Sequence, residues 1–101
     1  MEDMDTVIEK KSDTELQEPP MYAVIYHNDD FTTFDFVVQT LQEFFHKSHD
    51  EAIIITQKVH KEGRACAEVT TRDIAETKIA IVTTLAQSEG FPLKLTMERD
   101  S

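Results

Sequence analysis

The chain has 101 residues, which is enough for one domain with a modest core. Twenty acidic residues against ten Lys and Arg give a formal net charge of −10, which argues against nucleic acid and anionic membranes as partners. No apolar run approaches the roughly 20 residues of a transmembrane helix. The single cysteine, Cys66, excludes an internal disulfide and fits a reducing, intracellular compartment; we expect it to act as a small buried hydrophobe.

Residues 1–20 differ in composition from the rest of the chain. They contain few apolar side chains, so this stretch cannot bury enough surface to offset its ordering entropy. Pro19 and Pro20 then impose extended geometry at the boundary. We predict a flexible acidic tail over residues 1–20 and one core domain over residues 21–101. The acidic residues of the tail are Glu2, Asp3, Asp5, Glu9, Asp13, Glu15 and Glu18.

The first two elements of the core follow directly. Residues 21–27 are rich in β-branched and aromatic side chains and predict a strand. Thr32 or Thr33 can cap a helix, and Thr32 with Asp35 resembles a capping box with Asp in place of Glu. The helix should end near residues 46–47. Its apolar face is formed by Phe34, Val37, Val38, Leu41, Phe44 and Phe45.

A second helix and a second strand come next. Ser48 and Glu51 form a capping box, and Gly63 suits the helix C-terminus. The apolar face of this helix is formed by Ala52, Ile55, Thr56 and Val59. Residues 64–70 predict a strand in which Ala65, Ala67 and Val69 alternate with polar residues.

The last part of the core predicts a third helix and a third strand. Thr70 or Thr71 can cap the helix, Asp73 lies in its first turn, and Gly90 ends it. Two apolar faces are possible, one formed by Ile74, Lys78, Ile81, Val82 and Leu85, the other by Ala75, Ile79, Val82 and Ala86. Alternation after Pro92 predicts the strand. The order β-α-α-β-α-β predicts an α/β fold, a two-layer sandwich of three mainly antiparallel strands and three helices.

The most informative local motif is Asn28-Asp29-Asp30, between the first strand and the first helix. Two carboxylates and an amide form a cluster of acceptors that suits a cation with several N–H donors, such as an ammonium. The same residues are also common in turns. His60, near the end of the second helix, is either a helix-end histidine favoured by the dipole or an acceptor for a bound donor.

Other kinds of site have little support in the sequence. Cys66 does not lie in a nucleophile elbow, and the two glycines do not form a phosphate-binding pattern. The four histidines lack the short spacing of a structural zinc site. We therefore expect no catalytic residues, no metal and no cofactor. A small hydrolase using Cys66 and His60 remains a rival reading.

Many residues from Pro19 onward make the chain resemble ClpS, the N-degron adaptor of the bacterial ClpAP protease. The match covers most of the chain, by spacing as well as identity. The matching residues are Pro19-Pro20-Met21-Tyr22, Val24, Asn28-Asp29-Asp30-Phe31-Thr32, Phe36-Val37, Leu41-Gln42, Phe44-Phe45, Val59-His60, Gly63, Ala75-Glu76-Thr77-Lys78 and Pro92-Leu93.

This resemblance implies a fold like that of the C-terminal domain of the ribosomal stalk protein. It also implies a non-enzymatic adaptor of the bacterial cytoplasm. Such an adaptor binds the free N-terminus of proteins that begin with Leu, Phe, Tyr or Trp and hands them to the N-terminal domain of the AAA+ unfoldase ClpA. A rival within the family is a regulator that binds ClpA but no longer reads N-termini.

The resemblance also assigns roles to residues. Asn28, Asp30 and His60 would hold the substrate's α-amino group. Asp29, between the first two, would point elsewhere and serve the turn. The hydrophobic pocket would be formed by Thr32, Phe34, Val37, Thr56, Val59 and Leu93. The residues facing the unfoldase would be Asp73, Glu76 and Lys78.

Three positions depart from the family pattern. Phe34 replaces a gatekeeping methionine, and His27 replaces an apolar residue just before Asn28. Thr56 replaces a methionine at the base of the pocket. The smaller, β-branched Thr56 should reshape the pocket and could admit Ile or Val as a first residue.

Overall fold

The computed structural model describes residues 19–100. The predicted acidic tail therefore lies almost wholly outside the described residues. The elements are β1 (Met21–His27), α2 (Phe34–Phe45), α3 (His49–Glu62), β2 (Arg64–Thr71), α4 (Arg72–Ser88) and β3 (Lys94–Asp100). Their order confirms the predicted β-α-α-β-α-β arrangement.

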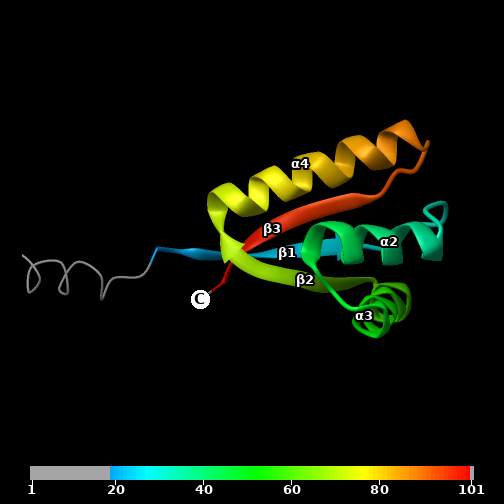
Figure 1. Cartoon of the computed structure of the whole chain (residues 1–101), viewed down its shortest axis with the longest axis horizontal. Coiled ribbons are helices and arrows are strands. Elements are labelled where there is room, and N and C mark those ends of the chain that lie inside the picture. The colour runs from blue at the N-terminus through cyan, green and yellow to red at the C-terminus, as the bar shows by residue number, and fades with distance from the viewer. Residues whose placement is uncertain (1–18, 101) are drawn as a thin grey trace, which may run out of the picture.

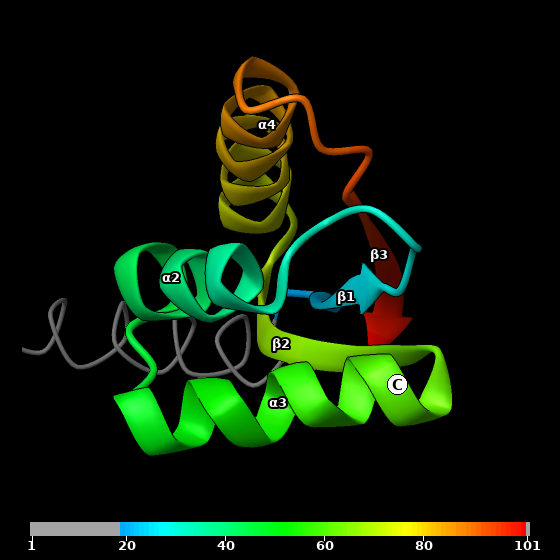
Figure 2. The ribbon, with the colours of Figure 1, turned by 90° about the vertical axis from the view of Figure 1, so that its right-hand side faces the viewer.

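The three strands form one sheet in the order β2-β1-β3, and both pairings are antiparallel. Helix α4 runs along the sheet and contacts β1 and β3, while α3 lies along β2 and packs against α2 (Figures 1 and 2). The helices thus form the second layer of the predicted sandwich. Within residues 19–100, no helix is long and apolar enough to cross a membrane.

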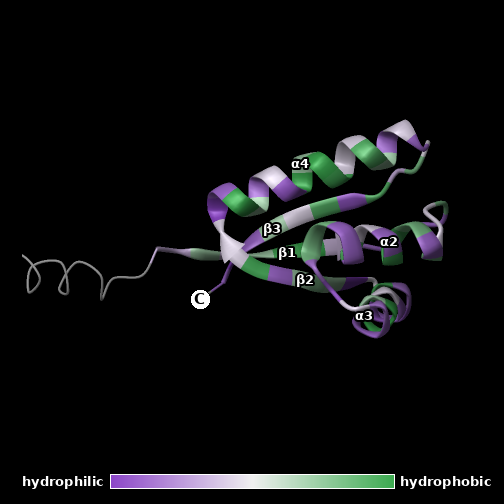
Figure 3. Ribbon diagram, in the orientation of Figure 1, coloured by the Kyte–Doolittle hydropathy of each residue, from purple (hydrophilic) through white to green (hydrophobic). Residues whose placement is uncertain are grey.

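The core lies between the helices and the sheet. Val24 and Tyr26 of β1 are fully buried, and Leu41 of α2 is buried with them. The Tyr26 hydroxyl donates to Thr40 Oγ1 at 2.8 Å, and Thr40 in turn donates to the Val37 carbonyl at 2.9 Å, so this buried polar pair is satisfied. Figure 3 shows apolar residues in the middle of β1 and β2 and at intervals along α4.

A β-bulge in β2 corrects one detail of the predicted strand. Val24 pairs with Glu68 but Ile25 pairs with Cys66, so Ala67 is the extra residue on β2. Beyond the bulge the alternation reverses. Val69, which the predicted alternation groups with Ala65 and Ala67, is 43% exposed, whereas Thr70 is buried. The bulge also places Glu68 opposite the buried Val24, on the side of the sheet that the helices cover.

The helix ends agree with the predictions except at the start of α2. Thr33 is the N-cap and accepts from the Phe36 amide at 3.2 Å, so the predicted capping box between Thr32 and Asp35 is wrong. The Thr32 hydroxyl bonds to another partner, Asp29. At α3 both bonds of the predicted capping box are present.

Two further expectations are settled by exposure. The core face of α4 is the one that holds Ala75, Val82 and Ala86, while Ile74 and Ile81 are exposed. Cys66 is also exposed, contrary to the expectation of a buried thiol. It pairs with Ile25, on the sheet face opposite the side chains of Val24 and Tyr26, which the helices leave open.

Candidate functional site

A cavity of about 420 Å³ lies where the loop after β1 faces α2 and α3. We call it the α2–α3 cavity. Its floor is formed by buried side chains of Val37, Thr56 and Val59. Its rim is more polar and more exposed, and consists of Asn28, Asp29, Asp30, Thr32, Phe34 and His60. The cavity therefore offers an apolar interior below a ring of hydrogen-bonding groups.

The rim is assembled from two segments that a backbone bond joins. Asn28 follows β1 directly, and its amide donates to the Gly63 carbonyl at 2.9 Å. Gly63 ends α3 in the left-handed region, with φ of 90°, which a glycine adopts without strain. His60 lies in the last turn of the same helix. This bond therefore keeps the Asn28 loop beside the helix end that carries His60.

Asp29 holds the loop in shape. Its Oδ1 accepts from the amides of Phe31 and Thr32 at 2.8 and 2.7 Å, and its Oδ2 accepts from the Thr32 hydroxyl at 2.7 Å. Partial burial alone would raise the pKa of Asp29, but these hydrogen bonds more than offset it, and the pKa lies below its ordinary value. Asp29 is therefore an ionised carboxylate whose oxygens are both engaged within its own loop.

The neighbours of Asp29 on the rim are differently placed. The side chains of Asn28, Asp30 and His60 are exposed and form no hydrogen bond with other side chains or backbone of residues 19–100. A carboxylate, an amide oxygen and a neutral imidazole nitrogen can all accept hydrogen bonds. The rim can thus receive a group with several N–H donors and a positive charge.

Most of the predicted pocket residues are brought together here. Thr32, Phe34, Val37, Thr56 and Val59 all line the cavity. Leu93 does not line it, and is buried in the core instead. Phe34 lies at the rim with 42% of its surface exposed. The predicted contacts of these residues with a substrate stay predictions.

Thr56 has a contact that the sequence did not predict. Thr56 Oγ1 donates to the Ala52 carbonyl one turn earlier at 2.7 Å. This bond could not be told from spacing alone, since a helical threonine can also turn its hydroxyl outward. Asp29, by contrast, serves the turn as expected, because Asp side chains commonly accept from the backbone amide two residues on, here that of Phe31.

A second hollow, of about 410 Å³, lies between α2 and α4, and we call it the α2–α4 groove. Its lining is apolar at Phe44, Ile74 and Ile81. Two of the predicted unfoldase-facing residues, Asp73 and Lys78, also line it. The complete lining is Glu43, Phe44, His46, Asp73, Ile74, Thr77, Lys78 and Ile81.

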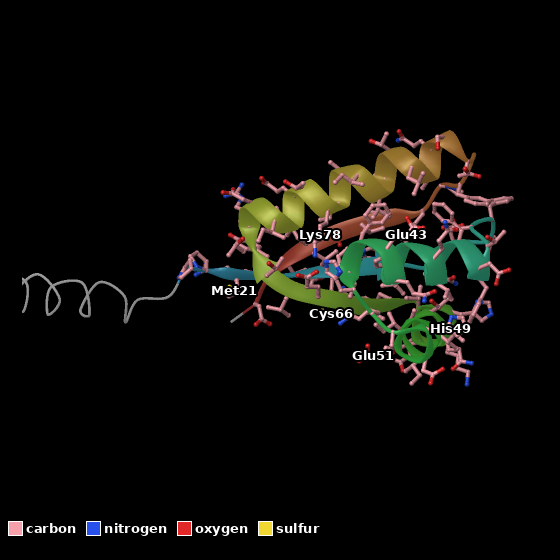
Figure 4. The ribbon with its side chains drawn as sticks, in the orientation of Figure 1. Met21, Glu43, His49, Glu51, Cys66 and Lys78 are labelled. Carbon is pink, nitrogen blue, oxygen red and sulfur yellow. The ribbon has the colours of Figure 1, made fainter. Side chains whose placement is uncertain are left out.

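Lys78 and Glu76 differ in their availability to a partner. Lys78 lies between α4 and α2 (Figure 4), where its Nζ is 2.7 Å from Glu68 Oε1 and 5.1 Å from the centre of the Phe45 ring. The two side chains of this ion pair are only 19% and 26% exposed. Glu76 is more open and pairs with Arg72 at 3.2 Å, one turn earlier on α4.

The chain is similar in sequence to one family of known proteins. A family model described as ATP-dependent Clp protease adaptor protein ClpS matches residues 17–96. The ATP-dependent Clp protease adapter protein ClpS of Desulforapulum autotrophicum is 51% identical over 82 residues, covering 81% of this chain and 79% of that protein. The protein of the same name from Helicobacter hepaticus is 45% identical over 93 residues, covering 92% and 94%.

A solved structure shows the same similarity in three dimensions. The structure of Agrobacterium tumefaciens ClpS2 bound to L-phenylalaninamide superimposes with a TM-score of 0.79 and 38% sequence identity. The match covers 82% of this chain and 100% of that one.

Proposed function

Because the chain belongs to the ClpS family of adaptors of the ATP-dependent Clp protease, we propose that it binds free protein N-termini in the α2–α3 cavity. The proposed substrates begin with a bulky hydrophobic residue: Leu, Phe, Tyr or Trp, with Ile or Val as further candidates. The chain would act as an adaptor and not as an enzyme. It would deliver these proteins in the bacterial cytoplasm to the unfoldase ClpA of the ClpAP protease.

The observation that carries this proposal is the division of the cavity into a buried floor and a polar rim. A free α-amino group has a pKa near 8 and is mostly cationic at pH 7, with three N–H donors. Asp30 supplies charge, and Asn28 and neutral His60 supply two further acceptors. The first side chain then enters the floor region, where burying a Leu or Phe contributes about 1.5–3 kcal/mol.

The ligand of the similar structure supports this assignment. L-phenylalaninamide, which is bound to the Agrobacterium ClpS2, combines a free amino group with a phenylalanine side chain and an amidated carboxyl. It therefore has the chemistry of an N-terminal phenylalanine in a polypeptide. The site proposed here has acceptors and an apolar floor for the same two groups.

Peptide titration tests the proposal. Peptides that begin with Leu, Phe, Tyr, Trp, Ile, Val or Ser are titrated into the protein, each with a free and an acetylated N-terminus. Acetylation removes the charge and two donors, and each desolvated acceptor left unpaired costs about 1–3 kcal/mol. We expect only free peptides with large apolar first residues to bind. Equal affinity for free and acetylated forms would rule out recognition of the ammonium.

Delivery would use a different surface. We propose that ClpA docks by its N-terminal domain on the side of α4 that bears Asp73, Glu76 and Lys78, and that the acidic residues before Pro19 engage the unfoldase during delivery. The α2–α4 groove supports this, because Ile74 and Ile81 are large apolar side chains that are exposed there.

Substitution in the groove separates docking from substrate binding. Ile81→Asp should abolish ClpAP degradation of a protein with a free N-terminal Phe, while its affinity for the matching peptide stays unchanged. Ile54→Asp is the matched control, because Ile54 is an exposed isoleucine of α3 that does not line the groove. Equal loss in both variants would argue against docking at the groove.

The alternative of a regulator that binds ClpA without reading N-termini makes an opposite prediction. It would bind ClpA and yet show no preference for free peptides over acetylated ones. The titration above therefore decides between the two readings.

A further inference from the structure

The two hydroxyl groups of the α2–α3 cavity have a fixed direction of hydrogen bonding. Thr32 Oγ1 donates its proton to Asp29 Oδ2, and Thr56 Oγ1 donates its proton to the Ala52 carbonyl, both at 2.7 Å. Neither acceptor carries a proton of its own, since one is a backbone carbonyl and the other is an ionised carboxylate. Each hydroxyl has one proton, and that proton is already used.

The consequence is that both hydroxyls can only accept from a ligand. Their oxygen atoms keep lone pairs, so each can receive an N–H or O–H but cannot donate one. The other floor residues, Val37 and Val59, are apolar. The floor of the cavity, formed by Val37, Thr56 and Val59, therefore offers the Thr56 oxygen as an acceptor and no side-chain donor.

Thr56 is the hydroxyl that the tip of an inserted side chain would reach. It is 4% exposed and belongs to the floor, whereas Thr32 is only half-buried and belongs to the rim. A ring that enters with its amino group held at the rim directs its far end toward the floor. Whether Thr56 Oγ1 receives a hydrogen bond then depends on whether the far end of the ring carries a donor.

We propose that Thr56 makes the cavity selective for a first residue whose tip carries a hydrogen-bond donor, namely Tyr, over the apolar Phe. This rests on the proposed binding of free N-termini and specifies its substrate class. Side chains that end in an acceptor alone, such as methionine sulfoxide, would face the Thr56 oxygen without a proton between the two and would be rejected.

Phe and Tyr peptides provide the direct test, because the two side chains differ only by one hydroxyl. Affinities of free peptides beginning with Phe or Tyr are measured by calorimetry for the wild type and for Thr56→Val, which replaces the hydroxyl by a methyl group of similar shape. One neutral hydrogen bond corresponds to about a threefold to tenfold preference. We expect the wild type to favour Tyr by this factor and Thr56→Val to lose the preference, as judged by the Tyr to Phe ratio within each variant.

Two further variants control the measurement. Thr56→Ser retains the hydroxyl and should retain the Tyr preference even if its affinities fall overall. Thr70→Val removes a buried hydroxyl of β2 outside the cavity and should leave the Tyr to Phe ratio as in the wild type. Thermal melts of all variants show whether each is folded at the temperature of the titration.

The outcomes separate the two proposals. A Tyr to Phe ratio that is the same in wild type and Thr56→Val, with binding still limited to free N-termini, overturns the role of Thr56 and leaves the proposed function intact. A wild-type protein that binds the Phe peptide more tightly than the Tyr peptide would also overturn the role of Thr56 and leave the proposed function intact. If free peptides bind no better than acetylated ones, the proposed function fails and this inference fails with it.

Discussion

Asp29 and Asp30 are adjacent in the sequence but have different environments. Asp29 accepts three hydrogen bonds from its own loop, while Asp30 is exposed at the cavity rim. One carboxylate thus shapes the loop and the other is available to a ligand. The spacing from Asp29 to Thr32 matters as much as the identity of either residue.

Replacing Asp29 by Asn should weaken peptide binding. Asn keeps one acceptor oxygen for the amides of Phe31 and Thr32, but its nitrogen cannot accept the Thr32 hydroxyl, and a negative charge near the proposed ammonium site is lost. We expect the affinity for a free Phe peptide to fall about tenfold, from the loss of one charge-assisted hydrogen bond. Calorimetry measures this affinity, with Asp35→Asn as the control. An equal loss of affinity in the two variants would indicate a general effect of charge.

The low pKa of Asp29 fixes the pH range of its contribution to stability. The pKa of Asp29 is lower in the folded state than in the unfolded chain, so its ionised form stabilises the fold. This stabilisation is complete above the ordinary pKa of the unfolded chain and is lost as pH falls through the folded-state pKa. The difference in unfolding free energy between wild type and Asp29→Asn should therefore be constant from pH 8 to 5. It should shrink only in stronger acid, as denaturant titrations at several pH values would show.

His27 should produce a pH dependence in a milder range. Its Nε2 is 2.7 Å from Thr96 Oγ1. Burial lowers the pKa of His27, repulsion from Lys94 and Arg64 lowers it further, and Glu98 partly offsets them. The unfolded chain thus takes up this proton at higher pH than the folded one, so stability should fall as pH drops below about 6.5.

The His27→Gln variant isolates this effect. Gln cannot be protonated in this range, so its melting temperature should fall less between pH 7.5 and 5.5 than that of the wild type. Parallel pH profiles for the two proteins would show that His27 does not contribute.

At the level of helices and strands, the bulge at Ala67 explains why an ion pair joins α4 to β2. It turns Glu68 to the side of the sheet that the helices cover, where Lys78 meets it beside the Phe45 ring. Three elements, α2, β2 and α4, therefore meet at one partly buried charge pair. Since this pair lies next to the α2–α4 groove, it also supports the proposed docking surface.

Lys78→Met should destabilise the fold. Removing one member of a mostly buried pair leaves the other charge without its partner, and because Glu68 remains 26% exposed we expect a loss of about 1–2 kcal/mol. Denaturant unfolding measures this loss. The matched control is Arg72→Met, whose pair with Glu76 is exposed and should change stability by less than about 0.5 kcal/mol. Equal losses would contradict a special role for the Lys78 pair.

The elements themselves were largely predictable, because capping and turn residues act locally. Ser48, Glu51 and Gly63 correctly marked both ends of α3. The errors arose where contacts with other segments determine the pairing of a strand or the hydrogen bond of a side chain. Alternation cannot show that Ala67 is an extra residue, so Val69 was grouped with Ala65 and Ala67 although it is exposed. The spacing left Thr32 and Thr33 as alternative helix caps and suggested a capping box from Thr32 to Asp35, which does not form because the Thr32 hydroxyl bonds to Asp29 instead.

The residues that line the α2–α3 cavity were largely predictable, but their hydrogen bonds were not. The resemblance to a family named Asn28, Asp30, His60 and most of the residues that line the cavity. It could not show that Asp29 and Ala52 use the protons of Thr32 and Thr56, because such bonds depend on the rotamer of each side chain.

Across the full chain, the net charge of −10 should act on the rate of binding. An acidic protein attracts a cationic N-terminus over roughly a Debye length, about 10 Å at 0.1 M salt. The association rate of a free Phe peptide should therefore fall several-fold between about 0.02 and 0.5 M NaCl, while its dissociation rate changes less. Stopped-flow measurements test this, with a peptide of net negative charge expected to show the opposite trend.

Cys66 has a practical consequence for such measurements. It is the one thiol in the sequence, it is exposed, and it lies on the strand face opposite the buried side chains of Val24 and Tyr26. A maleimide fluorophore would therefore attach to the natural protein at a single known position outside the α2–α3 cavity. Energy transfer from that dye to a labelled peptide would report binding without any engineered residue.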